Sequence, residues 1–347
     1  MHAAPTLSTR QLNRTVLGRQ LLLQRSPLPL PQVLEAIGGI QAQYAPSMYI
    51  GLWSRVEGFE RDHLTSALAD RSVVQGTLLR ATIHLVSRDD YWPLELAVRA
   101  SRRAWWLRSQ RAALSVADLE EAAAVVRAEL VNGPVSHPEL AARVGPASMM
   151  ALHIFTDVVR VPPSGTWAKR RANVYATAHK WVGPEPDLAV ADAVDYALRR
   201  YLSGFGPARP KDIASWTGLP LSQIRGSLER IEIVRFRTDE AEDLFDLADL
   251  PLADADTPAP VRFLPTWDAT LLVHARRAGV LLEEDRGRIF HVRNPQSDAT
   301  FLVDGVVAGT WRHDGDRVVI DAFRPLSASA RSDVDEEAAR LGALFAP

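Results

Sequence analysis

Residues 209–237 read RPKDIASWTGLPLSQIRGSLERIEIVRFR. Two short amphipathic segments flank a turn at Gly218-Leu219-Pro220, and glycine and proline are the residues that most strongly interrupt helices. A strand-like run, IVRFR, follows the second segment, and a longer helix is expected before the first, in LAVADAVDYALRRYLSGFG (188–206). Two short helices joined by a tight turn and followed by a hairpin are typical of a winged helix.

The same order of elements is predicted twice more. The first unit has amphipathic helical segments at 9–25, at 31–44, from Pro46 onward and at 61–71, followed by a Val-, Thr- and Ile-rich hairpin at 72–87. The second unit has helices at 116–131 and 137–144, the segment ASMMALHIFTDVV (147–159), and a wing in VPPSGTWAKRR (161–171). We therefore expect three tandem winged helices, although the three copies share little sequence.

The C-terminal part of the chain has a different character. Residues 239–256 hold eight carboxylates without the spacing of a calcium loop, which favours a solvated wing or linker over a metal site. After TPAP (257–260), strand-like runs alternate with glycine turns at Gly287, Gly305 and Gly315, and a helix is expected at 329–345. This region predicts a small antiparallel sheet or barrel closed by a helix. The expected domains are 1–115, 116–187, 188–258 and 259–347, in an α+β fold that is mostly helical.

Composition excludes several classes of protein. The chain has 347 residues, is 47% hydrophobic and 24% charged, and has no cysteine, which rules out disulfides, thiolate catalysis and cysteine-ligated metal. No apolar run is long enough for a transmembrane helix, and the N-terminus lacks an apolar signal core. We expect a cytoplasmic protein that needs no cofactor and no metal, with no membrane partner.

The net charge of −2 conceals an uneven distribution. Residues 1–181 carry 21 basic against 14 acidic residues, and residues 182–347 carry 19 against 28. Two basic stretches without acids, SRRAWWLRSQR (101–111) and 160–181, also contain tryptophans. Basic groups interleaved with aromatic rings suit a polyanion with stackable bases. A solvated helix face with core tryptophans would give the same pattern.

Six stretches together resemble one family, the winged-helix DNA glycosylases of the AlkZ/YcaQ type. The matching stretches, in family order, are IQAQYAPSMYIGLWSR (40–55), LLRATIHLVS (78–87), VPPSGTWAKR (161–170), FGPARPKDIASWTGLP (205–220), FLPTWDATLLVHARR (263–277) and FLVDGVVAGTWR (301–312). The resemblance implies a C-shaped molecule of three winged helices with a C-terminal β-barrel. It also implies excision of N-alkylated purines from double-stranded DNA, and in AlkZ-like members the unhooking of interstrand crosslinks left by DNA-alkylating antibiotics.

The family's catalytic motif, Gln-x-Gln, matches Gln41-Ala42-Gln43, which places the chain with the AlkZ branch. A purine alkylated at N7 of guanine or N3 of adenine is cationic and leaves without protonation, so neutral amides are sufficient to position water and stabilise an oxocarbenium ion. Residues two apart diverge on a helix but converge on extended backbone. Because Gly38-Gly39 weakens the preceding helix, we expect both glutamines at or beyond a helix end, facing a concave basic surface.

Further residues are expected around the motif. The cations expected to contact phosphates are Arg102, Arg103, Arg108, Lys169, Arg170 and Arg171. A hairpin is also expected around Asp285–Val292, where it would place Arg286 or Arg288 in a DNA groove. Three further residues are expected near the site: Tyr44, Trp53 and His84. The alternative for Tyr44 and Trp53 is that they pack in the core, and the alternative for His84 is a buried structural role.

Two other hypotheses remain at this point. Winged helices are common in transcriptional regulators, which would footprint a specific operator. The other hypothesis is a protein that binds DNA lesions without catalysing their removal. The sequence leaves open the lesion, the choice between self-resistance and general repair, and which glutamine positions the water; a monomer is expected.

Overall fold

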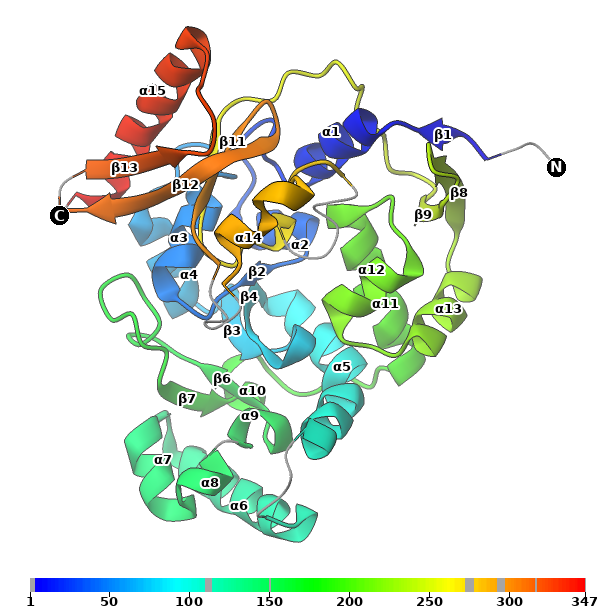
Figure 1. The fold of residues 1–347 in the computed structure, drawn as a ribbon. Coiled ribbons are helices and arrows are strands. Elements are labelled where there is room, and N and C mark those ends of the chain that lie inside the picture. The colour runs from blue at the N-terminus through cyan, green and yellow to red at the C-terminus, as the bar shows by residue number, and fades with distance from the viewer. Residues whose placement is uncertain are drawn as a thin grey trace.

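The computed structural model is a mixed α+β fold and describes residues 4–109, 114–149, 151–271, 278–291, 297–315 and 317–346 (Figure 1). Its α-helices are α1 (Thr9–Arg19), α2 (Leu30–Ile37), α3 (Ala45–Trp53), α4 (Arg61–Ala69), α5 (Arg88–Ser109), α6 (Val116–Glu129), α7 (His137–Val144), α8 (Pro146–Met149), α9 (Leu152–Phe155), α10 (Ala178–Trp181), α11 (Val190–Phe205), α12 (Pro210–Thr217), α13 (Leu221–Arg230), α14 (Arg286–Ile289) and α15 (Ala328–Phe345). Its strands are β1 (Thr6–Leu7), β2 (Ile40–Gln41), β3 (Val73–Thr77), β4 (Ile83–Ser87), β5 (Val135–Ser136), β6 (Val158–Arg160), β7 (Val174–Thr177), β8 (Ile233–Thr238), β9 (Asp243–Leu247), β10 (Arg262–Leu264), β11 (Thr300–Val303), β12 (Val306–Asp314) and β13 (Arg317–Ala322).

The helix-turn-helix expected at 209–237 is confirmed. Pro210 stands in the first turn of α12, and Gly218 ends that helix in the left-handed conformation, with φ of 80°. Pro220 then caps the start of α13, and β8 pairs with β9 as the wing. The N-terminal strand β1 adds to this wing in parallel with β8, a long-range pairing that local sequence patterns do not reveal.

The other two winged helices are joined through their wings. The hairpin of β3 and β4 is confirmed. The wing expected at 161–171 is the loop between β6 and β7, which pair with each other. Strand β6 also pairs with β3, so the two wings form one six-stranded sheet in the order β2-β4-β3-β6-β7-β5. In Figure 1 the helices α6 to α9 lie at one end of this sheet and α11 to α13 lie beside α5.

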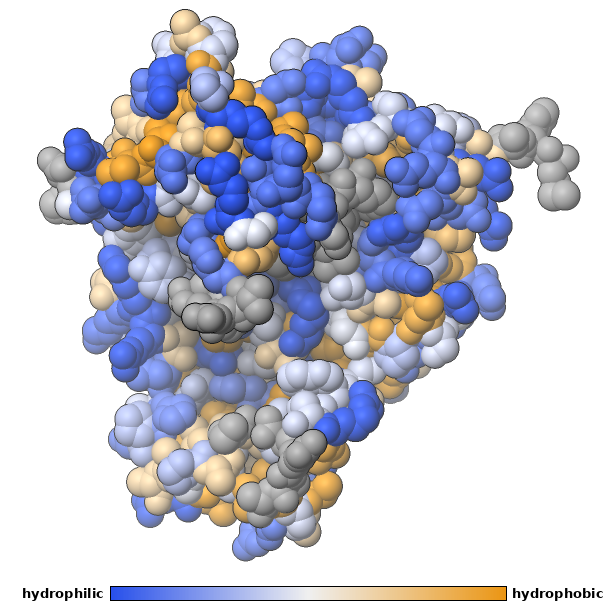
Figure 2. Space-filling view, in the orientation of Figure 1, coloured by the Kyte–Doolittle hydropathy of each residue, from blue (hydrophilic) through white to orange (hydrophobic). Residues whose placement is uncertain are grey.

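The C-terminal region is an open sheet rather than a barrel. Its four antiparallel strands have the order β10-β11-β12-β13, and within the described residues β13 does not return to β10, which corrects the barrel that the family resemblance implies. Helix α15 packs on β13 and β10, and Figure 2 shows apolar side chains gathered where α15 meets this sheet. The helix expected at 329–345 is confirmed.

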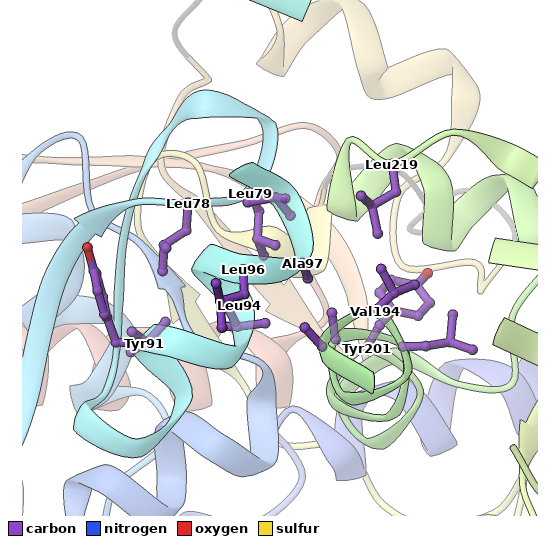
Figure 3. Packing of buried hydrophobic residues seen from close by; sticks show 14 of the residues in the cluster. Leu78, Leu79, Tyr91, Leu94, Leu96, Ala97, Val194, Tyr201 and Leu219 are labelled. Atoms are coloured by element: carbon purple, nitrogen blue, oxygen red, sulfur yellow. The ribbon is translucent and has the colours of Figure 1, made fainter. Parts of the chain in front are cut away.

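One large apolar core joins the first and third winged helices. It contains side chains of β3, β4, α5 and α11 to α13. Figure 3 shows Leu78 and Leu79, from the turn after β3, close to Leu94 and Leu96 of α5, with Tyr201 on the neighbouring helix α11. The position of the β3–β4 turn is therefore set by both units at once. In the described part of the chain, no helix is long and apolar enough to cross a membrane.

A buried ion pair ties the first unit to the C-terminal sheet. Arg55, just after α3, donates two hydrogen bonds of 2.9 Å to the carboxylate of Asp268, which follows β10. Both side chains are almost fully buried. Burial alone would raise the pKa of Asp268, but the Arg55 guanidinium outweighs this effect and lowers it. The pair fixes α3, and with it the glutamine segment that leads into α3.

We predict that Asp268→Ala lowers the free energy of unfolding by about 3–5 kcal/mol, because it leaves the Arg55 cation buried without a partner. Urea denaturation measures this change. The matched control is Asp314→Ala, which removes the acid of the exposed Arg312–Asp314 pair and should cost less than about 1 kcal/mol. Equal losses for the two variants would contradict the structural role of Arg55–Asp268.

Candidate active site

The backbone between α2 and α3 is extended because two glycines end the helix before the glutamines. Gly38 caps α2 with φ of 77° and ψ of 25°, and Gly39 has a φ of 80°. A Cβ atom on Gly39 would lie 2.9 Å from the carbonyl oxygen of Leu85, so glycine is needed where this segment approaches β4. The expected break at the motif is confirmed, and the continuation of the helix to Tyr44 is wrong.

Gln41 and Gln43 lie on the same face of the extended segment. Side chains alternate along such backbone, and the intervening Ala42 is buried in the core together with Ile40. The Nε2 of Gln41 donates a hydrogen bond to the Oε1 of Gln43. Gln41 is 7% exposed, whereas Gln43 is exposed. The expectation that the two amides converge beyond a helix end is therefore confirmed.

Arg80 holds the Gln41 amide from the turn between β3 and β4. Its Nη2 donates to the Oε1 of Gln41 at 3.1 Å, and its Nη1 donates to the backbone oxygen of Trp216 at 2.6 Å. Because the Oε1 of Gln41 accepts from Arg80, the amide presents its Nε2 group to Gln43. Donation thus runs in one direction, from Arg80 to Gln41 and from Gln41 to Gln43.

Arg80 is held in a costly conformation. Its φ is 52° and that of Ala81 is 57°, a region that costs a non-glycine residue about 1–3 kcal/mol. No ion pair between Arg80 and a carboxylate is present among the described residues. Burial lowers the pKa of Arg80 to about 10, so the guanidinium is charged at neutral pH. Strain and an unneutralised, half-buried charge are typical of functional sites.

Arg80 was not predicted as a site residue, although it stands in the stretch LLRATIHLVS (78–87) that carries part of the family resemblance. The available signal was that Arg80 is the one arginine of the predicted hairpin at 72–87 and stands in its turn. Nothing local in the sequence shows that this turn faces Gln41, because the pairing of β2 with β4 that brings them together is long-range.

The third winged helix closes one side of the site. Trp216, near the end of α12, accepts the hydrogen bond from Arg80, and a Cβ atom on Gly38 would lie 3.2 Å from the Trp216 ring. A Cβ atom on Gly218 would lie 3.4 Å from the backbone of Arg80. The helix-turn-helix is thus packed against both the glutamine segment and the turn that carries Arg80.

His84 lies beside the glutamines but is held neutral. It is the direct partner of Gln41 in the β2–β4 ladder, and its Nδ1 lies 3.0 Å from the backbone oxygen of Thr82. Burial lowers the pKa of His84 to about 3, and the Arg80 cation acts in the same direction while Thr82 opposes it. A histidine that stays neutral throughout the physiological range is not a general acid. Its buried structural role, one of the two alternatives above, fits this environment.

The wing of the second unit places basic side chains next to the motif. Lys169, Arg170 and Arg171 are exposed in the β6–β7 loop, and the Nη1 of Arg170 donates to the hydroxyl of Tyr44 at 3.1 Å. Tyr44 directly follows Gln43 and is 40% exposed. The structure therefore brings together two sets of residues that the sequence analysis singled out separately.

The other basic stretch differs from the expectation. Arg102 is buried, and its guanidinium is bonded to Glu95 and to the backbone oxygen of Thr77, so its expected availability to phosphate is wrong. Arg103 is paired with Glu120 and lies over the ring of Phe155. Both arginines were predicted to be available for DNA because their carboxylate partners, Glu95 and Glu120, stand outside the stretch 101–111. Arg108 is exposed, and residues 110 and 111 of this stretch lie outside the described residues.

The hairpin expected around Asp285–Val292 is wrong for residues 285–289, which are helical, whereas Phe290 forms an isolated antiparallel bridge with Ser297. Arg286 and Arg288 lie on the short helix α14, which follows a 3₁₀ turn. Arg288 stacks on Phe323 and lies 3.8 Å from the carboxylate of Asp285, and Arg286 lies over Phe290. Residues 292–296, at the end of the expected hairpin, and 272–277, at the end of a quoted stretch, lie outside the described residues.

Trp53 belongs to the core rather than to the site. It is 9% exposed, packs in the cluster that contains α2 to α4, and lies under the guanidinium of Arg25 at 4.7 Å. Within the described residues, no group of three or more histidine, aspartate or glutamate side chains is placed to hold a metal ion.

The fold and the site define a winged-helix protein whose motif is a pair of amides beside basic loops, and comparison with known proteins identifies the family. The sequence profile described as DNA glycosylase AlkZ-like matches residues 34–344, and the chain belongs to this family of DNA glycosylases. It is therefore a DNA-repair enzyme that acts on DNA, rather than a transcriptional regulator.

A solved structure, the Streptomyces sahachiroi DNA glycosylase AlkZ, has the same fold. The two structures superimpose with a TM-score of 0.81 over 97% of this chain and 96% of that one, at 18% sequence identity. No curated protein sequence matches the chain. At this identity, the structural likeness establishes the architecture, and the site has to be argued from its own residues.

We predict a pH-dependent stability difference between the wild type and His84→Asn. An unfolded histidine binds a proton near pH 6.5, whereas folded His84 resists protonation until about pH 3. Between these values the unfolded state binds more protons, so the free energy of unfolding falls as the pH falls. From pH 7 to pH 5 the wild type should lose about 2 kcal/mol more than His84→Asn, measured by urea denaturation at both values. An identical loss in the two proteins would show that His84 takes up its proton normally in the folded state.

Proposed function

We propose that the enzyme hydrolyses the N-glycosidic bond of N-alkylated, cationic purines in double-stranded DNA, such as N7-alkylguanine and N3-alkyladenine, and leaves an abasic site. The observation that carries the proposal is the convergence of Gln41 and Gln43, which are hydrogen-bonded to each other and to Arg80. This arrangement supplies oriented amides and no group that titrates near neutral pH. It suits a leaving group that departs without being protonated.

The hydrogen bonds assign different roles to the two glutamines. The Oε1 of Gln41 is occupied by Arg80 and its Nε2 donates to Gln43, so Gln41 is a positioning residue. Gln43 is the exposed member of the pair, and its Oε1 keeps a second lone pair while its Nε2 keeps two hydrogens. Gln43 is thus the residue that holds water at C1′ and places a negative dipole against the oxocarbenium ion.

The β6–β7 loop would hold the DNA next to this pair. Lys169, Arg170 and Arg171 are exposed beside Tyr44, and contacts of such cations to phosphates position a duplex without reading its sequence. Arg108 is exposed at the end of α5 and would supply a further phosphate contact. One chain supplies both the glutamines and the basic loop, so the proposal needs no second subunit.

Bulky adducts and interstrand crosslinks are included in the proposed substrate range. Base flipping is obstructed when a lesion is joined to both strands. Because Gln43 is exposed rather than enclosed, its amide is accessible to a lesion that stays in the duplex. The same exposure accommodates simple lesions such as N7-methylguanine.

We predict that Gln43→Ala slows release of 7-methylguanine from a duplex with one N7-methylguanine by at least about 100-fold, the usual cost of losing one preorganised polar group at a reacting centre. Gln41→Ala should cost less, about tenfold, because it only loosens Gln43. Single-turnover kinetics measures both. Gln32, exposed on α2, provides the control Gln32→Ala, which should release base at the wild-type rate. Full activity of Gln43→Ala would leave a protein that binds lesions without catalysing their removal.

We predict that replacing Lys169, Arg170 and Arg171 together by alanine makes DNA binding less sensitive to salt. The slope of the logarithm of the association constant against the logarithm of the salt concentration should become less steep by about 3, since each phosphate contact contributes about 0.9. Fluorescence anisotropy with an undamaged duplex measures the slope between about 50 and 200 mM salt. Arg331→Ala, on the exposed side of α15, should leave the slope unchanged. A triple variant with the wild-type slope would remove this loop from the DNA interface.

A further inference from the structure

A cavity of about 250 Å³ lies next to the glutamine pair, separated from it by the side chain of Arg80. One wall is a single face of α5, with Val98, Ser101 and Trp105 at helical spacing. The β3–β4 turn, with Arg80, and Gly218 at the end of α12 supply other parts of the lining. The site described above makes no use of this cavity.

Trp105 is unusual among the tryptophans of this structure. Its side chain is 51% exposed, and in the described part of the chain its ring has no aromatic or cationic partner. By contrast, the neighbouring Trp106 is buried against Phe155. A large exposed indole in the wall of a mostly apolar cavity is a ready surface for stacking a planar ring. Apolar cavities of about 150 Å³ already admit benzene in other proteins, so this one has room for one or two rings.

The charge of the residues that line the cavity determines whether it favours the cationic alkylated purine or a neutral aromatic ring. Arg80 contributes a cation that no carboxylate neutralises among the described residues, whereas the other arginine of the lining, Arg102, is neutralised by Glu95. A cationic alkylpurine is repelled by Arg80. A neutral aromatic ring gains a cation–π contact with Arg80 as well as stacking on Trp105. The cavity therefore favours a neutral ring carried by the lesion over the alkylated base itself.

We propose that this cavity binds the neutral aromatic substituent of a bulky purine adduct, stacked on Trp105, while Gln43 acts on the glycosidic bond of the same nucleotide. The inference rests on the proposed function and specifies its substrate class. It makes the cavity a specificity site: adducts with an aromatic arm gain binding there, and small alkyl lesions are excised without using it.

The experiment compares three duplexes, each with one lesion: N7-benzylguanine, N7-cyclohexylmethylguanine and N7-methylguanine. We expect Trp105→Leu to slow excision of N7-benzylguanine about tenfold or more, the usual effect of losing one stacking partner. Excision of N7-methylguanine should change by less than about twofold. The cyclohexyl adduct should also be little affected, because it has similar bulk and no π-face.

Two control variants separate stacking from folding. Trp105→Phe keeps an aromatic ring and should retain most of the wild-type preference for the benzyl lesion. Val131→Ala removes an exposed apolar side chain outside the cavity and should behave as wild type on every duplex. Thermal unfolding of each variant identifies a general loss of structure, and Trp105→Phe keeps the test decisive if Trp105→Leu is destabilised.

Each outcome has a distinct meaning. Selective loss of benzyl excision supports the proposal. Equal loss for all three lesions overturns it, because the cavity would then receive the alkylated base itself or serve only the fold. No loss for any lesion also overturns it. Failure of the underlying glycosylase mechanism shows up separately, as full activity of Gln43→Ala on all three duplexes.

Discussion

The hydrogen bond from Arg80 to the Oε1 of Gln41 is the interaction on which the site depends. An amide can turn over and exchange its donor and acceptor ends, and a cation at one end removes this freedom. With Gln41 fixed, its Nε2 faces Gln43, and the exposed amide is oriented in turn. Three separate parts of the fold converge to make this bond: the extended segment after Gly38-Gly39, the β3–β4 turn, and α12, whose Trp216 carbonyl holds the other end of the guanidinium.

The fold bears a cost for this arrangement. Two consecutive non-glycine residues in the left-handed region and a half-buried cation without a carboxylate partner among the described residues each disfavour the folded state. The shared core of the first and third winged helices fixes the turn despite that cost, because Leu78 and Leu79, which directly precede Arg80, are fully buried in it. A carboxylate partner would neutralise the half-buried Arg80 cation, but it would place an anion where the site needs to orient neutral amides and attract DNA. The unneutralised charge is consistent with the proposed DNA-binding role.

Local features of the sequence were predictable because their causes are local. Gly218 and Pro220 define the turn of the third winged helix, and Gly38-Gly39 places both glutamines on extended backbone. Features that depend on residues outside the motif or stretch in question were not predictable. The acid that neutralises Arg102 is Glu95, two turns earlier on the same helix but outside the basic stretch, and the sheet that joins the first two wings depends on the β3–β6 pairing. The segment 285–289 was misassigned because a run this short fits a helix as well as a strand, and α14 (Arg286–Ile289) tolerates Gly287.

The central claim is that the positive charge of the lesion drives departure of the base, so that uncharged amides complete the reaction. The most direct test compares duplexes containing N7-methylguanine with duplexes containing 7-methyl-7-deazaguanine, which has nearly the same shape and no charge on the five-membered ring. We expect rapid release of 7-methylguanine and no measurable release of the deaza base, with the two duplexes bound about equally well. Comparable release from both would contradict the account, because the enzyme would then have to protonate or otherwise activate a neutral base.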